Sequence, residues 1–352
     1  MSLEKMFHLK ENNTTVKTEI MAGVTSFMTM AYILAVNPNI LAAAGMDHGA
    51  VFTATAVASF IGTLCMALFA NYPFALAPGM GLNAYFAYTV VLGMGYSWEV
   101  ALAAVLTEGI IFIILSCFNI REAIFNAIPF NLKKAVSVGI GLFITFLGLQ
   151  NAKIVIGGAT LVGLFSVDGY NKTLADGLTA SMSDAGITVL LAIFGVLITG
   201  ILIVKNVKGN ILWGILITWI LGIICQFAGI YIPNPDLGFY NLLPDFSNGI
   251  SIPSLAPIMF KFSLKGVPVL EFIVIVFAFL FVDLFDTLGT LIGVSAKADM
   301  LDSEGRLPRI KGALLADAVG TTCGACLGTS TVTTFVESAS GVTEGGRTGL
   351  TS

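Results

Sequence analysis

Two aspartates lie inside an apolar run that is long enough to cross a membrane. Residues 267–296 read VPVLEFIVIVFAFLFVDLFDTLGTLIGVSA, and the run contains Asp283 and Asp286. About 20 apolar residues span the hydrocarbon core as an α-helix. A spacing of three places both carboxylates on nearly the same helix face. Acids at membrane depth are costly and usually face a cavity or another helix, so the run predicts a binding or proton-handling site.

The rest of the chain has the same character. Of its 352 residues, 56% are hydrophobic and 11% are charged, whereas soluble domains are about one quarter charged. We mark ten apolar segments, at roughly 20–44, 50–70, 73–95, 98–118, 133–151, 186–204, 209–230, 267–296, 311–327 and 329–346. This pattern predicts an all-α polytopic protein in a lipid bilayer. The net charge of -4 and the lack of a basic cluster speak against a nucleic-acid partner.

The distribution of basic residues predicts the orientation. With the N-terminus in the cytoplasm and ten crossings, all but four of the 17 Lys and Arg fall on the cytoplasmic side. The four exceptions are Lys153, Lys172, Lys261 and Lys265, all in long loops. Cytoplasmic loops carry the excess of basic residues in membrane proteins. We therefore predict a multi-pass protein of the cytoplasmic membrane with a cytoplasmic N-terminus and, since residues 1–19 are polar, no cleavable signal peptide.

The cysteines and histidines do not suggest a metal or a cofactor. Cys323 and Cys326 have CxxC spacing, but no second such pair accompanies them, and His8 and His48 are the two histidines. Zinc and redox motifs need further ligands or a suitable fold context. We interpret the cysteines as small packing residues and expect neither a metal site nor a cofactor.

Two of the apolar segments are poor simple helices. Residues 73–89 read PFALAPGMGLNAYFAYT, and residues 324–346 read GACLGTSTVTTFVESASGVTEGG. Proline and glycine weaken helices, and TSTVTTFV (329–336) favours extended backbone. Such backbone at membrane depth must be buried in protein or line a cavity. Interrupted segments at corresponding places in two halves indicate a transporter binding site.

These segments are the third and the tenth, which suggests a repeat of seven spans. Seven is odd, so the second copy would be inverted in the membrane. Residues 1–230 would form the first repeat, and residues 231–352 would form part of a second, with spans eight to ten. A complete second repeat needs fourteen spans, so we expect the sequence to be incomplete after the tenth.

The interrupted segments supply further candidate residues. Glu337 follows the extended stretch and precedes Ser338; a carboxylate beside a broken helix can meet a ligand, although a helix cap is a serious alternative. Asn83 takes the matching place in the third segment, followed by Tyr85 and Phe86. An amide and an aromatic ring can bind a flat heterocycle, although hydrogen bonding between helices would explain the asparagine equally well.

Two more acids lie in apolar segments. Asp317, in the ninth, is expected to support the aspartates of the eighth and to take part with Asp283, Asp286 and Glu337 in proton coupling. Glu108, in the fourth, has no companion motif. We interpret Glu108 as the acceptor of a structural hydrogen bond.

Four motifs in order resemble a known family. They are GVTSFMTMAYILAVNPNIL (23–41), ALAPGMGLNAYFAYTVV (75–91), VDLFDTLGTLIGVSAKADMLD (282–302) and GTSTVTTFVESASGVTEGGRTGLT (328–351). Together they resemble the adenine/guanine/hypoxanthine permeases, a branch of the nucleobase–cation symporters that also include xanthine and uracil permeases. The resemblance covers essentially the whole chain.

The resemblance implies a fold and a function. It implies two inverted seven-span repeats, interleaved core and gate domains, and short strands in spans three and ten. It implies uptake of purine bases with a proton, or another cation, by alternating access. Asp286 would bind the base, with Asp283 as the second choice, and Glu337 and Ser338 would contact it from span ten. Asn83, with Tyr85 or Phe86, would contribute from span three.

Two other functions are compatible with part of this pattern. Paired aspartates also occur in intramembrane enzymes, but proteases of this kind carry acids on two spans, and prenyl transferases carry a second acidic motif that is missing here. An anion channel or exchanger of related fold would be expected to have a basic or neutral site. The acids therefore favour a transporter over an enzyme. A homodimer is left open as the assembly.

Overall fold

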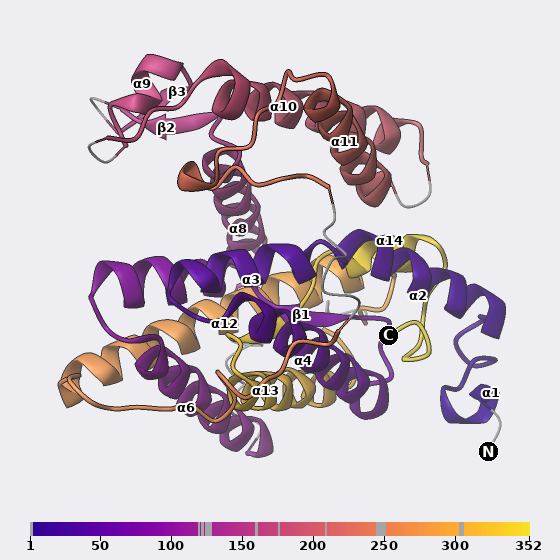
Figure 1. Ribbon diagram of the computed structural model, residues 1–352. Coiled ribbons are helices and arrows are strands. Elements are labelled where there is room, and N and C mark those ends of the chain that lie inside the picture. The colour runs from indigo at the N-terminus through magenta and orange to yellow at the C-terminus, as the bar shows by residue number, and fades with distance from the viewer. Residues whose placement is uncertain are drawn as a thin grey trace. The chain divides into compact units, whose positions relative to one another are not determined.

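The computed structural model describes residues 3–118, 120, 123, 129–158, 161–174, 177–207, 210–243, 251–302 and 306–352 (Figure 1). The chain forms two compact units. Unit 1 consists of Met1–Gly141 and Ile252–Ser352, and unit 2 consists of Leu142–Ser251. Helix α8 (Phe130–Asn151) crosses the boundary between these ranges.

Unit 1 is built mainly of helices. They are α1 (Leu3–Met6), α2 (Val16–Met30), α3 (Ile33–Ala43), α4 (His48–Phe69), α5 (Met80–Ala84), the π-helix η1 (Tyr85–Gly93), α6 (Trp98–Cys117), α12 (Val269–Lys297), α13 (Ile310–Leu327) and α14 (Ser338–Thr343). Helix α12 confirms that the run with the two aspartates is helical. Its 29 residues extend about 43 Å at 1.5 Å per residue.

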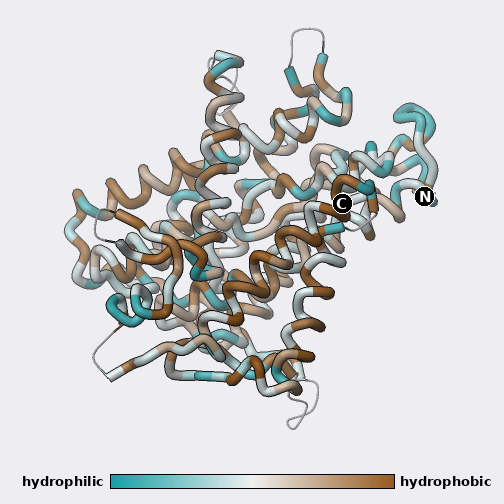
Figure 2. The backbone as a smooth tube through the Cα atoms, turned by 90° about the horizontal axis from the view of Figure 1, so that it is seen from above, coloured by the Kyte–Doolittle hydropathy of each residue, from teal (hydrophilic) through white to brown (hydrophobic). Residues whose placement is uncertain are grey.

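Five helical stretches among the described residues are long and apolar enough to span a membrane: Val16–Ala43, His48–Phe69, Trp98–Cys117, Met182–Val204 and Ile310–Leu327. Hydrophobic residues run along the helices, and hydrophilic residues gather near the N-terminus (Figure 2). Helix ends follow local signals. The Asp47 carboxylate accepts from the Ala50 N–H (2.7 Å) at the start of α4, and Gly328, at φ +96°, ends α13 in the left-handed conformation.

Two short strands interrupt the third and tenth segments, as the family resemblance implies. Strand β1 (Leu76–Pro78) pairs antiparallel with β4 (Val332–Thr334), with Ala77 opposite Thr333. The ladder continues beyond both strands, because Gly79 N–H donates to Thr331 O (3.0 Å) and Phe335 N–H donates to Ala75 O (2.9 Å). Both strands are fully buried, so protein surrounds this extended backbone.

Close helix packing around the strands depends on small residues. A Cβ on Gly320 of α13 would lie 3.2 Å from Gly62 Cα of α4 and 3.1 Å from Val332 Cγ1 of β4. Glycines allow two membrane helices to approach each other closely. Helices α4 and α13 therefore meet directly beside β4.

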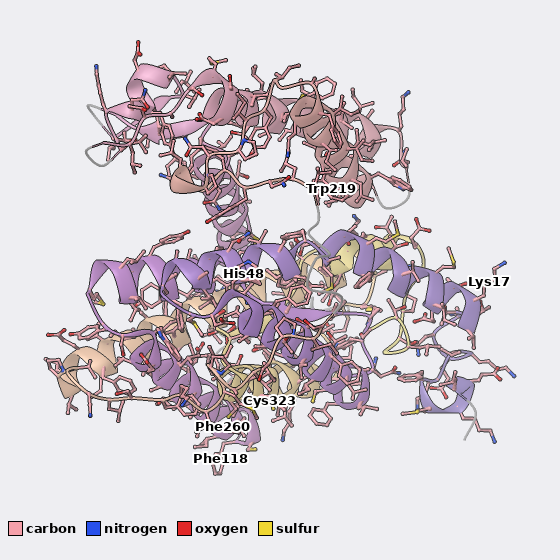
Figure 3. All side chains as sticks on the ribbon, in the orientation of Figure 1. Lys17, His48, Phe118, Trp219, Phe260 and Cys323 are labelled. Atoms are coloured by element: carbon pink, nitrogen blue, oxygen red, sulfur yellow. The ribbon has the colours of Figure 1, made fainter. Side chains whose placement is uncertain are left out.

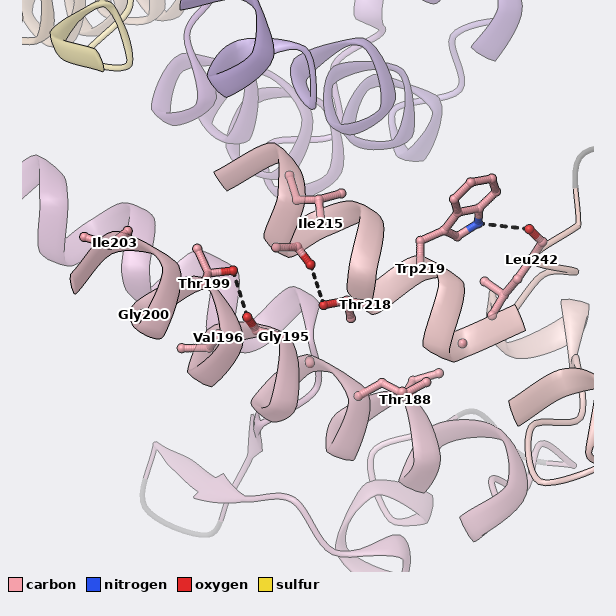
Figure 4. Close-up of a pocket in the computed structure, with 14 residues that line it drawn as sticks. Thr188, Gly195, Val196, Thr199, Gly200, Ile203, Ile215, Thr218, Trp219 and Leu242 are labelled. Carbon is pink, nitrogen blue, oxygen red and sulfur yellow. Dashed lines mark hydrogen bonds between the residues drawn. The ribbon is translucent and has the colours of Figure 1, made fainter. Parts of the chain in front are cut away.

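Unit 2 contains α9 (Val167–Asn171), the π-helix η2 (Met182–Gly186), α10 (Ile187–Val204), α11 (Asn210–Phe227) and the 3₁₀ turn η3 (Pro235–Leu237). Helices α10 and α11 pack antiparallel, with Gly195 against Thr218 and Gly214 against Thr199. An apolar pocket lies along this pair, and Trp219 Nε1–H donates to Leu242 O (3.0 Å) beside it (Figure 4).

One element departs from the predicted all-α class. Strands β2 (Val155–Gly157) and β3 (Val162–Leu164) form an antiparallel hairpin in a stretch expected to be a loop. The β-branched residues Val155, Ile156 and Val162 favour extended backbone. A Cβ on Gly158 would lie 2.7 Å from the Val162 carbonyl carbon, so the tight return of the hairpin depends on glycine.

Candidate functional site

A polar segment at the centre of unit 1 is held from all sides. Each of the five consecutive residues 329–333 is hydrogen-bonded by a side chain from a different helix. The pairs are Asn37 (α3) with Thr329 at 2.9 Å, Asn83 (α5) with Ser330, Glu108 (α6) with Thr331 at 2.7 Å, Thr321 (α13) with the Val332 carbonyl at 2.8 Å, and Thr287 (α12) with Thr333 at 2.8 Å. This network satisfies polar groups that lipid could not. The Glu108 bond to Thr331 agrees with the structural role expected of that acid.

Asp286 lies beside the point where β1 passes into α5. A Cβ on Gly79 would be 3.4 Å from Asp286 Oδ2. The Asp286 side chain is half-buried and lies within electrostatic range of Asp317 and Glu337. The structure therefore gathers three of the predicted acids, from α12, α13 and the end of β4, near the paired strands.

Glu337 connects the tenth segment to the first span. Its Oε1 accepts a hydrogen bond from the Tyr32 hydroxyl at 2.5 Å, and the same hydroxyl lies 3.5 Å from Met80 Sδ. Helices α2 and α14 also meet through the hydroxyls of Thr29 and Ser340, 2.8 Å apart. Glu337 is thus held where the first, third and tenth segments meet.

Asp283 lies one turn before Thr287 and is buried. The Thr287 hydroxyl lies 3.1 Å from Asp283 Oδ1 and 2.9 Å from Asp317 Oδ1, with the Thr333 hydroxyl at 2.8 Å. A hydroxyl has one hydrogen to donate and two lone pairs. Thr287 can therefore donate to only one carboxylate at a time, and the two acids are linked through it.

The third-segment residues separate into two environments. Asn83 is buried; its Oδ1 accepts from Ser330, and its Nδ2 has no hydrogen-bond partner among the described residues. Tyr85 is half-buried, and its ring meets Phe279 edge-on, with centroids 4.8 Å apart. Phe86 is fully buried in the apolar cluster that includes Leu82, so its ring packs in the core.

Ser338 has a backbone partner. Its Oγ accepts from the Ala75 N–H at 3.0 Å, which ties the start of α14 to the residue before β1. Because the hydroxyl supports the strand pair, any effect of Ser338 on a ligand would act partly through that pair.

Sequence reasoning missed Tyr32 and Thr287 as members of the site. Both lie in the quoted motifs, at MTMAY and DLFDT, but their importance comes from partners far along the chain. A Thr one turn after Asp283 could have been recognised as a hydrogen-bond donor to it. Tyr32 carried no comparable local signal.

The described residues contain no group of three or more His, Cys, Asp or Glu side chains that could hold a metal ion. The five cysteines are free thiols, and Cys323 lies on α13 (Figure 3). The polar side chains gathered around residues 329–337 carry carboxylates, hydroxyls and the amides of Asn37 and Asn83.

A sequence model of the permease family matches residues 17–351. The chain belongs to this family. The permease is 44% identical to the guanine/hypoxanthine permease PbuO of Bacillus subtilis, over 98% of this chain and 74% of that protein. It is 39% identical to the adenine permease AdeP of Escherichia coli, over 99% and 72% of the two chains. It is accordingly an integral membrane transporter and not an enzyme.

A solved structure resembles the permease in fold. It is the transmembrane domain of the cyanobacterial bicarbonate transporter BicA, with a TM-score of 0.59 at 16% identity, covering 95% of this chain and 78% of that one. At this identity, the likeness establishes a shared fold and carries no inference about substrate.

Proposed function

We propose that the permease carries purine nucleobases across the cytoplasmic membrane, with its N-terminus in the cytoplasm. The relatives are named for guanine, hypoxanthine and adenine. The observation that carries the proposal is the placement of Asp286 and Glu337 close to the paired strands. Purine bases present ring and exocyclic N–H groups, and carboxylates are strong acceptors for them.

Asp286 is the first choice for the base contact from α12, with Asp283 as the second choice, and Glu337 would be the second acid that contacts the base. The half-buried Asp286 side chain beside Gly79 would meet a base that approaches the β1–α5 junction. The unsatisfied amide donor of Asn83 would be satisfied by a purine acceptor after a small movement. Tyr85 is a better candidate than Phe86 for an aromatic contact, because Phe86 is enclosed in the core. Ser338 would shape the site through Ala75.

We propose that Asp283, Thr287 and Asp317 hold the coupling proton together with the base-binding acids. A proton on one carboxyl would let it donate to Thr287 while Thr287 donates to the other carboxylate. Thr287 also contacts Thr333 of β4. A change in protonation would therefore reach the strand beside the base.

Transport would proceed by alternating access. All the candidate residues belong to unit 1, which we propose as the core domain, and unit 2 would form part of the gate. The antiparallel β1–β4 pair, contributed by the third and tenth segments, is what an inverted repeat of seven spans would produce. On this proposal residues 1–230 are one repeat, and residues 231–352 belong to the second.

Uptake of radiolabelled hypoxanthine, guanine and adenine by purine-transport-deficient cells that express a full-length form of the protein tests the function. Asp286→Asn and Glu337→Gln should reduce uptake at least tenfold at equal surface expression. Asp168→Asn, an exposed acid on α9, is the matched control and should transport normally. No uptake by the wild type at normal surface expression would refute the function, and normal uptake by both site variants would refute the site.

Coupling is tested in the same cells with a protonophore. Symport predicts that concentrative uptake stops when the proton gradient collapses, while equilibration of the base continues slowly. Uptake that is unchanged by the protonophore but lost without sodium would show that sodium, and not the proton, is the coupling ion.

A further inference from the structure

Tyr32 lies between α2 and α3. Its ring packs against an apolar cluster of Met30, Ile33, Ala75, Ala77 and Phe335, which includes one residue of β1 and the residues just before β1 and just after β4. Thr25 and Thr29 donate to carbonyls of the preceding turn, an arrangement that bends helices. The ring therefore has little freedom, and its hydroxyl is directed at Glu337 Oε1 (2.5 Å).

Close packing of α2 against α14 also helps to fix the distance between Tyr32 and Glu337. A Cβ on Gly341 of α14 would lie 2.7 Å from the Ala22 carbonyl oxygen of α2. Thr29 and Ser340 join the two helices by their hydroxyls. Because α2 and α14 cannot shift without breaking these contacts, Tyr32 and Glu337 are held in register.

We propose that Tyr32 is a positioning residue that presents Glu337 to the N–H edge of the base; the inference rests on the proposed function of the site. The Tyr32 hydroxyl donates its single hydrogen to Oε1, which leaves the second carboxylate oxygen to accept from the ligand. A carboxylate fixed in this way accepts from one particular N–H of the purine. Tyr32 would thus set which ring nitrogen must carry a hydrogen.

Tyr32→Phe tests this role, because the phenyl ring keeps the packing and loses only the donor. We expect the KM for hypoxanthine to rise about tenfold while the maximal rate changes less than twofold. Tyr88→Phe is the matched control, since the Tyr88 side chain is 40% exposed and lies in η1. It should leave both values unchanged.

Competition by N-methylated hypoxanthines gives a readout that a purely structural role would not move. In the wild type, methylation of the nitrogen that donates to Glu337 should weaken competition strongly compared with methylation elsewhere. In Tyr32→Phe this discrimination should fall about tenfold. Discrimination is a ratio within one protein, so it can be measured even if the variant accumulates poorly.

The outcomes separate the two proposals. Wild-type KM and wild-type discrimination in Tyr32→Phe would overturn the positioning role and leave purine transport intact. A Tyr32→Phe effect of equal size in a Glu337→Gln background would also overturn it, because residues that act through one another are not additive. Absence of purine uptake by the wild type would instead refute the proposed purine transport on which the role of Tyr32 rests.

Discussion

Gly79→Ala should disable the site through one methyl group. Gly79 has φ -70° and ψ 127°, which alanine adopts without strain, so the backbone tolerates the change. The new Cβ, however, would lie 2.6 Å from Thr333 Cγ2, 3.3 Å from Leu82 Cδ1 and 3.4 Å from Asp286 Oδ2. The first distance is about 1 Å shorter than an ordinary carbon–carbon contact. Thr333 cannot turn away easily, because its hydroxyl bonds to Thr287.

Overpacking of this kind costs about 1–3 kcal/mol. If the strands must move to accept the methyl group, the arrangement that binds the base loses that free energy. Binding would weaken between about fivefold and somewhat more than a hundredfold. Isothermal titration of purified protein with hypoxanthine measures the loss directly, and uptake measures its consequence.

Gly293→Ala, on α12, is the matched control. Apart from the adjoining backbone of α12 itself and the two chain neighbours, no atom of the described residues lies within 4 Å of a Cβ built at Gly293, and alanine favours helix over glycine by about 1 kcal/mol. The control should bind like the wild type and melt at the same or a slightly higher temperature. Hypoxanthine affinity and melting temperature equal to wild type in Gly79→Ala would refute the close approach of β1, β4 and Asp286.

Three further substitutions separate function from stability. Thr287→Val removes a buried hydroxyl with three polar partners. It should abolish concentrative uptake and lower the free energy of unfolding by about 1–3 kcal/mol. Thr343→Val, at an exposed position on α14, is the control and should change neither. Glu19→Gln removes a buried carboxylate that accepts four hydrogen bonds from residues 347–351. It should lower the melting temperature by several degrees. An unchanged melting curve would show that Glu19 does not stabilise this segment. Phe86→Ala should cost about 3–5 kcal/mol of stability, so surface expression should fall for every substrate alike, whereas a selective loss of one base would restore Phe86 as a ligand contact.

The main features of the fold could be predicted from local sequence patterns. The length and apolar character of 267–296 predicted α12, the Pro and Gly of segment three predicted an interrupted helix, and TSTVTTFV predicted extended backbone in segment ten; the strand in segment three was implied by the family resemblance. These signals depend on a few neighbouring residues and need no knowledge of partners. The hairpin of β2 and β3 lacked such a signal, because its short strands lie in a stretch rich in turn residues.

The finer features depended on contacts between distant residues. Tyr32 and Glu337 are 305 positions apart, and nothing near Tyr32 distinguishes it from an ordinary aromatic in a span. Tyr85 and Phe86 could not be assigned to faces, because α5 continues into the π-helix η1. A π-helix has more residues per turn than an α-helix, so α-helical spacing misplaces the side chains that follow.

The five-helix support of residues 329–333 has a consequence for the order of assembly. Asn37, Asn83 and Glu108 are synthesised 292, 247 and 223 residues before their partners. Domains form progressively as the chain is made, at about 5–20 residues per second. The helices that carry Asn37, Asn83 and Glu108 are therefore present for at least about ten seconds, at the faster rate, before the residues that bind their polar groups have been synthesised. We expect this polar network to form only after residues 329–333 have been made, so a ribosome-stalled chain that ends before residue 329 should be a preferred substrate of membrane quality control.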